Sequence, residues 1–244
     1  MLLRFLGTGA ADWTEPNPDG EYRRFTSTLF DSCLLIDVTA SVLEEIPDTD
    51  TIKDVLFTHS HKDHFDLEAL KQLAPCRVWA HESWANEIEG PGLEVHGLRI
   101  CDSIDIAGFH ITPMPSNHST TKEYETTLHY LIEKEAKQLL YATDGAWLLN
   151  EEHRIIGDRQ LDAAIFDATI GDGHEGDWRI FEHNSMSMIR LMTKTMIQTG
   201  RLKQGAPVFL THFARTLNLS QQEMEDRLEK PFVVCRDGLE AELF

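Results

Sequence analysis

Four potential metal ligands fall within six residues just after a short apolar run at residues 55–57. They are His59, His61, Asp63 and His64. In extended backbone alternate residues share a face, so His59 and His61 can reach one ion. Asp63 and His64 lie past the turn and can reach a second ion. Imidazole and carboxylate ligands suit zinc, manganese or iron, so the segment predicts a metal site at a strand end. The alternative is a polar loop with surface histidines.

Three more potential ligands come just beyond apolar strand candidates later in the chain. They are His118, Asp144 and His212. A catalytic ion needs at least three protein donors and an open position for water or substrate. Each of these residues taken alone could be a hydrogen-bonded loop residue. Their recurrence at three strand ends favours a ligand role for all of them.

Strands and helices interleave along the whole chain. The expected strands cover residues 2–6, 33–36, 54–57, 77–80, 110–114, 128–132, 138–142, 163–166 and 208–210, and the expected helices cover 41–46, 67–73, 83–89, 186–199 and 221–228. Several strands between residues 94 and 142 follow one another without a helix, which favours mixed or antiparallel sheets over one doubly wound parallel sheet. The pattern predicts an α/β protein in which layered sheets are flanked by helices. No composition shift divides the chain, so we expect one domain over residues 1–244.

Composition and charge narrow the classes of partner. Of 244 residues, 41% are hydrophobic and 26% charged, which is an ordinary globular composition. The formal charge of −19 argues against a large basic surface for nucleic acid or an anionic membrane. The four cysteines form no Cys-x-x-Cys pair, and no stretch approaches the roughly 20 apolar residues of a membrane span. The apolar stretch at the N-terminus is too short for the apolar region of a signal segment. We expect a soluble cytoplasmic protein with a small partner.

The His-x-His-x-Asp-His motif, with a later His, Asp and His, resembles the metallo-β-lactamase-fold hydrolases that hold two metals. This resemblance implies a four-layer αββα sandwich of mixed sheets. Within that superfamily the chain is most similar to the phosphoribosyl cyclic phosphate phosphodiesterases of the PhnP group. The segments that carry this closer resemblance are Phe5–Ala10, Tyr22–Arg24, Leu35–Asp37, Pro115–Ser119 and Thr143–Asp144.

The resemblance implies a role for each candidate residue. His59, His61 and His118 hold one metal, Asp63, His64 and His212 hold the other, and Asp144 bridges them. His183, which precedes a predicted helix, contacts the scissile phosphate and donates a proton, and Asp37 orients a ligand. The residues expected to take part in catalysis are Asp63, Asp144 and His183. A helix-entry histidine and a plain strand-end aspartate are the alternative interpretations of His183 and Asp37.

One departure leaves the substrate open. The related phosphodiesterases hold a structural zinc with cysteines of the first long loop and a later histidine. Here residues 12–20 contain no cysteine and Arg215 stands three residues after His212, so no third metal is expected. The chain also lacks the long arm with which tRNA 3′-processing endonucleases hold tRNA, so no long nucleic acid is expected.

The leading hypothesis is a hydrolase with two divalent ions, zinc or manganese with iron possible, that cleaves a small anionic phosphodiester such as phosphoribosyl cyclic phosphate or a nucleotide. Alternatives are a lactone, thioester or carboxyl-ester hydrolase of the same fold, a single-iron dioxygenase and a non-catalytic metal-bound binding module. A homodimer rests on analogy only. The loops at 12–24 and 171–182 are expected near the site, and His174 is a candidate to close over the substrate.

Overall fold

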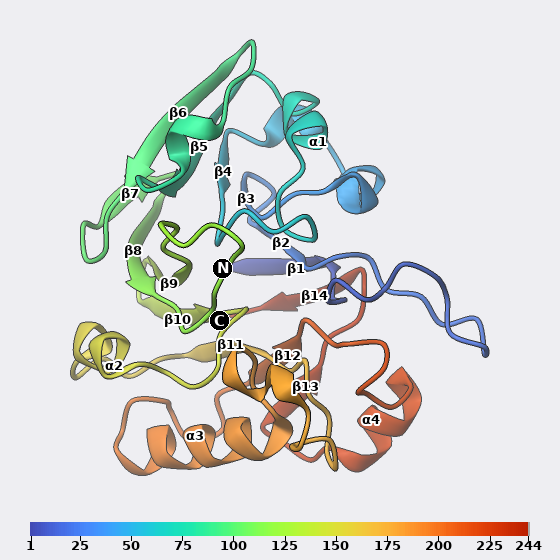
Figure 1. The fold of residues 1–244 in the computed structure, drawn as a ribbon. Coiled ribbons are helices and arrows are strands. Elements are labelled where there is room, and N and C mark those ends of the chain that lie inside the picture. Colours follow the sequence, from blue (N-terminus) through green and yellow to red (C-terminus); the bar gives the residue numbers. More distant parts are fainter. Residues whose placement is uncertain (244) are drawn as a thin grey trace.

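Residues 1–243, which the computed structural model describes, form two mixed sheets of seven strands each (Figure 1). The first sheet has the order β14 (Leu239–Glu242), β1 (Leu2–Gly7), β2 (Ser27–Phe30), β3 (Leu34–Ile36), β4 (Asp54–Leu56), β5 (Cys76–His81), β6 (Leu93–Leu98). The second has the order β13 (Phe232–Val234), β12 (Val208–Thr211), β11 (Ala163–Asp167), β10 (Lys137–Ala142), β9 (Leu128–Lys134), β8 (Phe109–Pro115), β7 (Ile104–Ile106). Strands β3 to β6 run parallel, as do β10 to β13, and the other pairs are antiparallel. The expectation of mixed sheets is confirmed.

Alternation along the strands builds three apolar layers. In β10, Leu139 and Tyr141 belong to the core between the two sheets, whereas Leu140 and Ala142 face the helices outside. Successive side chains of a strand point to opposite faces, so a wholly apolar strand requires cover on both sides. The architecture is therefore the predicted four-layer αββα sandwich.

The outer layers cover one face of each sheet (Figure 1). Helices α2 (Asn150–Ile156), α3 (Met186–Gln198) and α4 (Gln221–Arg227) lie on the second sheet, and α1 (Leu67–Lys71) lies on the first with the 3₁₀ turns η1 (Ala40–Glu45), η2 (Thr49–Thr51) and η3 (Ala85–Glu87) nearby. Helix α3 buries Met188, Ile189, Met192 and Met196, which confirms their interpretation as core residues. None of the helices within residues 1–243 is both long and apolar enough to cross a membrane.

The differences from the predicted elements are concentrated at sheet edges and in short turns. The sequence analysis missed β2, β6, β7, β13, β14 and α2, and the helices expected at 41–46 and 83–89 are only the 3₁₀ turns η1 and η3. Edge strands such as β14 and β6 bury few residues and carry charged ones, which weakens the period of two. Pro47 and Pro91 follow the two expected helices closely and disfavour longer helical segments there.

The two sheets bring their parallel strands to one common edge. Ile36 of β3 pairs with Leu56 of β4, so the residues that follow both strands emerge together. In the second sheet Phe166 of β11 pairs with Ala142 of β10 and with Leu210 of β12. The carboxyl ends of parallel strands are where sites form in α/β folds, and this edge holds the candidate ligands.

Candidate metal centre

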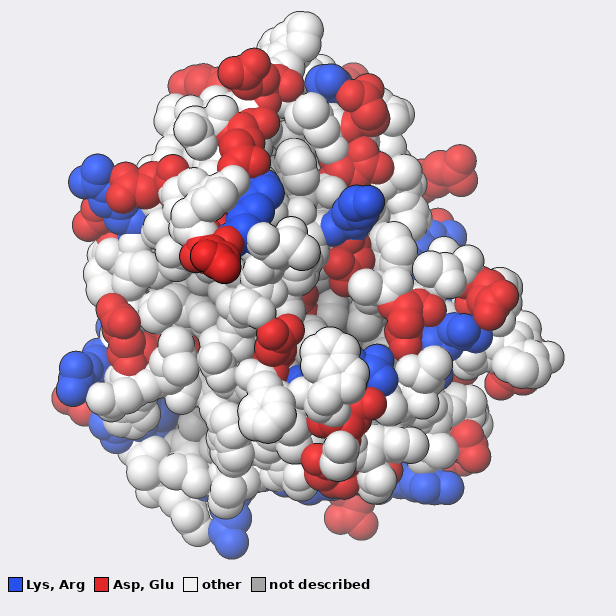
Figure 2. All heavy atoms as spheres, viewed as in Figure 1, with Lys and Arg blue, Asp and Glu red and all other residues white. Residues whose placement is uncertain are grey.

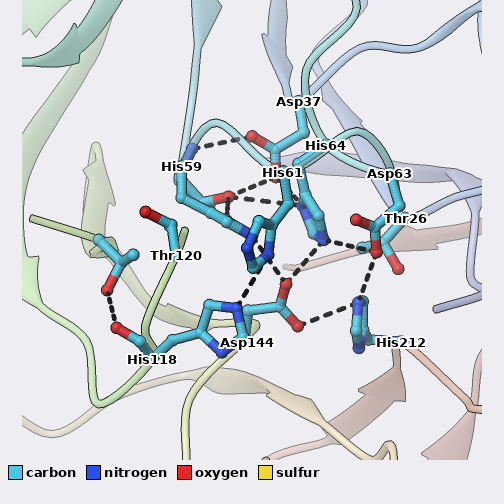
Figure 3. Close-up of polar contacts among 12 residues, drawn as sticks. Thr26, Asp37, His59, His61, Asp63, His64, His118, Thr120, Asp144 and His212 are labelled. Atoms are coloured by element: carbon cyan, nitrogen blue, oxygen red, sulfur yellow. Dashed lines mark hydrogen bonds and ion pairs between the residues drawn. The ribbon is translucent and has the colours of Figure 1, made fainter. Parts of the chain in front are cut away.

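His59, His61 and His118 form one group of donor atoms. One ring nitrogen of each lies within 4.8 Å of the others, and His61 Nδ1 is 3.2 Å from His118 Nε2. The first two follow β4 in the first sheet, while His118 follows β8 in the second. Figure 3 shows the three rings converging from opposite sides. The structure thus brings this predicted ligand set together across the two sheets.

A second group contains Asp63, His64, Asp144 and His212. His212 Nε2 lies 3.4 Å from Asp63 Oδ2 and 3.0 Å from Asp144 Oδ1. His64 Nε2 lies 3.6 Å from Asp63 Oδ2 and 2.8 Å from Asp144 Oδ2. All four residues are buried, and one ligand atom of each lies within 4.8 Å of the others.

Asp144 lies between the two groups. Its Oδ2 is 3.3 Å from His59 Nε2, in the first group, and 2.8 Å from His64 Nε2, in the second. Its other oxygen faces His212. A carboxylate in this position can contribute one oxygen to each of two ions, which is the bridging role predicted for it.

Several of the donor atoms lack a hydrogen-bond partner within the protein, and a divalent cation would satisfy them. His59 Nε2, His64 Nε2 and Asp144 Oδ1 are buried and make no hydrogen bond with acceptable geometry, although they lie within ion-pair distance of their neighbours. Leaving buried polar atoms without hydrogen bonds costs about 1–3 kcal/mol each. A donor set of imidazoles and carboxylates suits zinc, manganese or iron. Each of the two groups could therefore hold one such ion.

Burial and neighbouring charges set the charge states of the candidate ligands. Burial would raise the pKa of Asp144, but His212 and His64 lower it well below its usual value, so the carboxylate stays ionised. Burial lowers the pKa of His118 to about 4, which keeps its lone pair available. Burial would also lower the pKa of His212, but Asp144 and then Asp63 raise it to about 10. Protons and metal ions thus compete for the same nitrogen atoms.

Asp37, predicted to orient a ligand, contacts His64 directly and His59 through Thr58. Its Oδ2 accepts a hydrogen bond from His64 Nδ1 at 2.7 Å and another from the Thr58 hydroxyl at 2.8 Å. Since that hydroxyl has donated its only proton, it accepts from His59 Nδ1 at 3.0 Å. Both imidazoles therefore carry their proton on Nδ1 and turn Nε2 to the centre.

Asp167 repeats this construction in the second sheet, and the sequence analysis missed it. It is fully buried at the end of β11, where Oδ2 accepts from His183 Nδ1 at 2.7 Å. Its Oδ1 accepts from the Thr169 hydroxyl at 2.6 Å, and that hydroxyl accepts from His212 Nδ1 at 2.8 Å. An aspartate directly after an apolar strand is the same signal that identified Asp37 and could have identified this residue.

Three of the strand-end residues have left-handed backbone conformations. Asp37, Asp144 and His212 have φ of 59°, 58° and 58°. Such conformations are uncommon for residues other than glycine and concentrate at functional sites. Here they turn the side chains from the sheet edge into the centre.

His183 lies beside the ligand groups without belonging to the predicted set. Its ring stacks on that of His212 at 5.4 Å, and its Nδ1 is 3.5 Å from Asp144 Oδ1. Burial would lower its pKa, but Asp167 and then Asp144 raise it. The side chain also lines a cavity of about 230 Å³ that opens above the centre.

The cavity shows which loops approach the centre. Its lining residues are Ala10, Ala11, Asp12, His61, Asp63, His118, Asp144, Thr169, Trp178, Arg179, Glu182, His183, His212 and Ala214. The loop at 171–182 contributes Trp178, Arg179 and Glu182, whereas the loop at 12–24 contributes only Asp12. His174 does not line this cavity; it lines a neighbouring one with Asp172 and Met186, so the structure does not place it over the site.

Comparison with known proteins identifies the family. A profile of the Beta-lactamase superfamily domain matches residues 29–213, and the chain belongs to this superfamily. Its fold is the metallo-β-lactamase fold, whose members are mostly metal-dependent hydrolases. A comparison with curated protein sequences found no match.

Solved structures share the fold over the whole chain. The zinc-bound PqqB of Methylobacterium extorquens aligns with a TM-score of 0.77 and 17% identity, covering 100% of both chains. The metallo-β-lactamase fold protein YhfI of Bacillus subtilis aligns with a TM-score of 0.74 and 12% identity over 98% of each chain. The human short form of tRNase Z aligns with a TM-score of 0.72 and 16% identity, covering 100% of this chain and 99% of that one. Identities this low establish the fold alone.

Proposed function

We propose that the protein is a hydrolase with two divalent metal ions, zinc or manganese, that cleaves a small phosphodiester. The observation that supports this proposal is the position of Asp144 between two groups of potential donor atoms, with His183 at its side. Two bound ions would supply an activated water and neutralise charge on the phosphoryl oxygens. The remaining chemistry belongs to the side chains of the protein.

His183 is the residue best placed to act on the substrate. Its Nδ1 donates to Asp167, which leaves Nε2 for the cavity. An imidazolium held by a buried carboxylate can donate a hydrogen bond to a phosphoryl oxygen or a proton to the leaving oxygen. A phosphodiester retains a charged oxygen throughout hydrolysis, so this third cationic group favours a phosphodiester over a neutral carboxyl ester.

A small substrate agrees with the surface around the site. In Figure 2 the Lys and Arg side chains on this face are interspersed with Asp and Glu and form no large basic patch. A long polyanion needs several phosphate contacts from basic groups, which such a face does not offer. Attraction for an anionic substrate would be local, from the divalent ions themselves.

The test is hydrolysis of bis(p-nitrophenyl) phosphate by protein loaded with zinc or manganese, with chelator-treated protein as the control and p-nitrophenyl acetate and a lactone as competing substrates. Asp144→Ala should lose both bound metal and turnover. Asp105→Ala, which removes an exposed carboxylate that pairs with His110, should keep both. Turnover of the carboxyl esters alone would contradict the phosphodiesterase proposal, and full activity of Asp144→Ala would contradict the site.

A further inference from the structure

A short turn beside the cavity carries two exposed aromatic side chains, of which Trp178 lines the cavity. This turn is the 3₁₀ helix η4 (Trp178–Phe181), in which residues three apart lie above one another. Trp178 and Phe181 therefore share one side of the turn, and they are 70% and 76% exposed. Ile180 lies on the other side and packs against a small buried cluster formed by Ala10, Ile170, Ala214 and Leu217.

Hydrogen bonds from the residues before and after the turn fix its conformation, and this conformation leaves the two rings exposed. The Asp177 carboxylate accepts from the Arg179 backbone N–H at 2.9 Å and from the Arg179 guanidinium at 2.8 and 3.0 Å. The His183 backbone N–H donates to the Arg179 carbonyl at 2.8 Å. The position of the two aromatic rings is thereby tied to that of His183.

Trp178 lines the same cavity as His61, His118 and His183. Glu182 lines it too, and one of its carboxylate oxygens accepts from the Ser119 hydroxyl at 2.5 Å. A carboxylate has acceptor sites for further hydrogen bonds. The mouth of the cavity thus combines an exposed apolar ring, a hydrogen-bond acceptor and the metal-binding residues below.

Exposed aromatic rings beside a site for phosphate are suited to stacking on a planar ring. We infer that Trp178, flanked by Phe181, stacks on the base of a nucleoside phosphodiester whose phosphate lies at the metal centre. Glu182 accepts a hydrogen bond from a sugar hydroxyl or a base amino group. This inference rests on the proposed function and narrows its substrate to nucleoside esters.

Three diesters with the same leaving group separate the contributions. They are thymidine 5′-(p-nitrophenyl phosphate), phenyl p-nitrophenyl phosphate and methyl p-nitrophenyl phosphate. The wild type should have its highest kcat/KM for the thymidine ester, because the phenyl ester offers no group to Glu182 and the methyl ester offers no ring. A phenyl ester that equals or exceeds the thymidine ester would overturn the assignment to nucleosides.

Trp178→Ala should lower the ratio of kcat/KM for the thymidine ester to that for the methyl ester by about 5- to 150-fold, since stacking of one base contributes about 1–3 kcal/mol and 1.4 kcal/mol is tenfold. Trp178→Phe keeps a ring and should recover most of the ratio. Leu191→Ala removes another exposed apolar side chain, 55% exposed on α3, and should leave the ratio unchanged. An unchanged ratio in Trp178→Ala would overturn the inference.

Calorimetric binding of thymidine 5′-monophosphate to the metal-loaded protein tests the platform without turnover. Trp178→Ala should weaken this binding by a similar factor, and equal binding would count against the platform. If the wild type cleaves none of the diesters, the proposed function fails and the binding result alone decides the inference. Sedimentation of the wild type and Trp178→Ala tests whether a second copy of the chain occupies the two rings instead. A wild-type dimer that Trp178→Ala converts to a monomer, with unchanged nucleotide binding, would identify a self-association surface and overturn the inference.

Discussion

Asp37→Asn gives a sharp test of how the centre is held. The substitution preserves the shape of the side chain and replaces one carboxylate oxygen by an NH₂ group. The amide oxygen can still accept from the Thr58 backbone N–H, which now donates to Asp37 Oδ1 at 2.8 Å. The NH₂ group then faces two hydrogen-bond donors, the Thr58 hydroxyl and His64 Nδ1. To avoid facing a donor, His64 must move its proton to Nε2, the nitrogen needed for the metal.

The expected loss follows from this tautomer change. Removing a carboxylate that orients a ligating histidine typically weakens metal binding or activity about 10- to 100-fold. At 1.4 kcal/mol per factor of ten, this equals about 1.4–2.8 kcal/mol. The metal held by Asp63, His64 and His212 should weaken first, because His59 loses only an indirect contact through Thr58.

The assay is competition for zinc against a chromophoric chelator of known affinity, at equilibrium and fixed pH. Asp105→Asn is the matched control, because Asp105 accepts a similar hydrogen bond from His110 at 2.9 Å on the exposed edge of the second sheet. It should bind both metals like the wild type. If Asp37→Asn also retains two metals with unchanged affinity, the orienting role of Asp37 is wrong.

Three further predictions concern other parts of the account. His183→Gln should keep its metal content but lose about 10²–10⁴-fold in kcat, with a larger loss for alkyl than for p-nitrophenyl leaving groups, because general acid catalysis matters most for a poor leaving group; equal losses for both would contradict proton donation. Gly145→Ala places a methyl group 2.7 Å from the buried ring of His129, so it should lower the free energy of unfolding by about 1–3 kcal/mol in a denaturant titration. Gly176→Ala is the control, because a methyl group there meets no atom within 4 Å and should leave the free energy of unfolding nearly unchanged. In the folded protein at pH 8, iodoacetamide should label the exposed Cys101 and spare the buried Cys76. Burial raises the pKa of the Cys76 thiol to about 11, so only about one Cys76 side chain in a thousand is a thiolate at this pH. Peptide mapping that finds both cysteines labelled at similar rates would contradict the packing around Cys76.

The predictable parts of the fold are those with strong local patterns. The runs at residues 139–142, 163–166 and 208–210, within β10, β11 and β12, are wholly apolar because both of their faces are covered, and the sequence identified all three strands. Helix α2 was not predicted because one of its buried side chains is Glu152, which hydrogen-bonds to His129 at 2.6 Å, where the helical pattern would require an apolar residue. A buried hydrogen bond between distant side chains leaves no periodic signal in either segment.

The candidate site shows a similar division. The potential ligands were recognisable because each follows an apolar strand, and the structure gathers them at one edge, although their roles as ligands stay predictions. The hydroxyls of Thr58 and Thr169 could not be assigned from the sequence, because their function depends on register between neighbouring strands. The same holds for Trp178 and Phe181, whose shared orientation follows from a 3₁₀ turn that the sequence analysis did not predict.

The central claim is that two ions held around Asp144 carry out phosphodiester hydrolysis. Its most direct test is a titration of metal-free protein with zinc or manganese in which bound metal and turnover of bis(p-nitrophenyl) phosphate are measured on the same samples. We predict that binding saturates at two ions per chain and that turnover rises with occupancy of the second site. Saturation at a single ion, or two bound ions without turnover of any phosphodiester, would contradict the account.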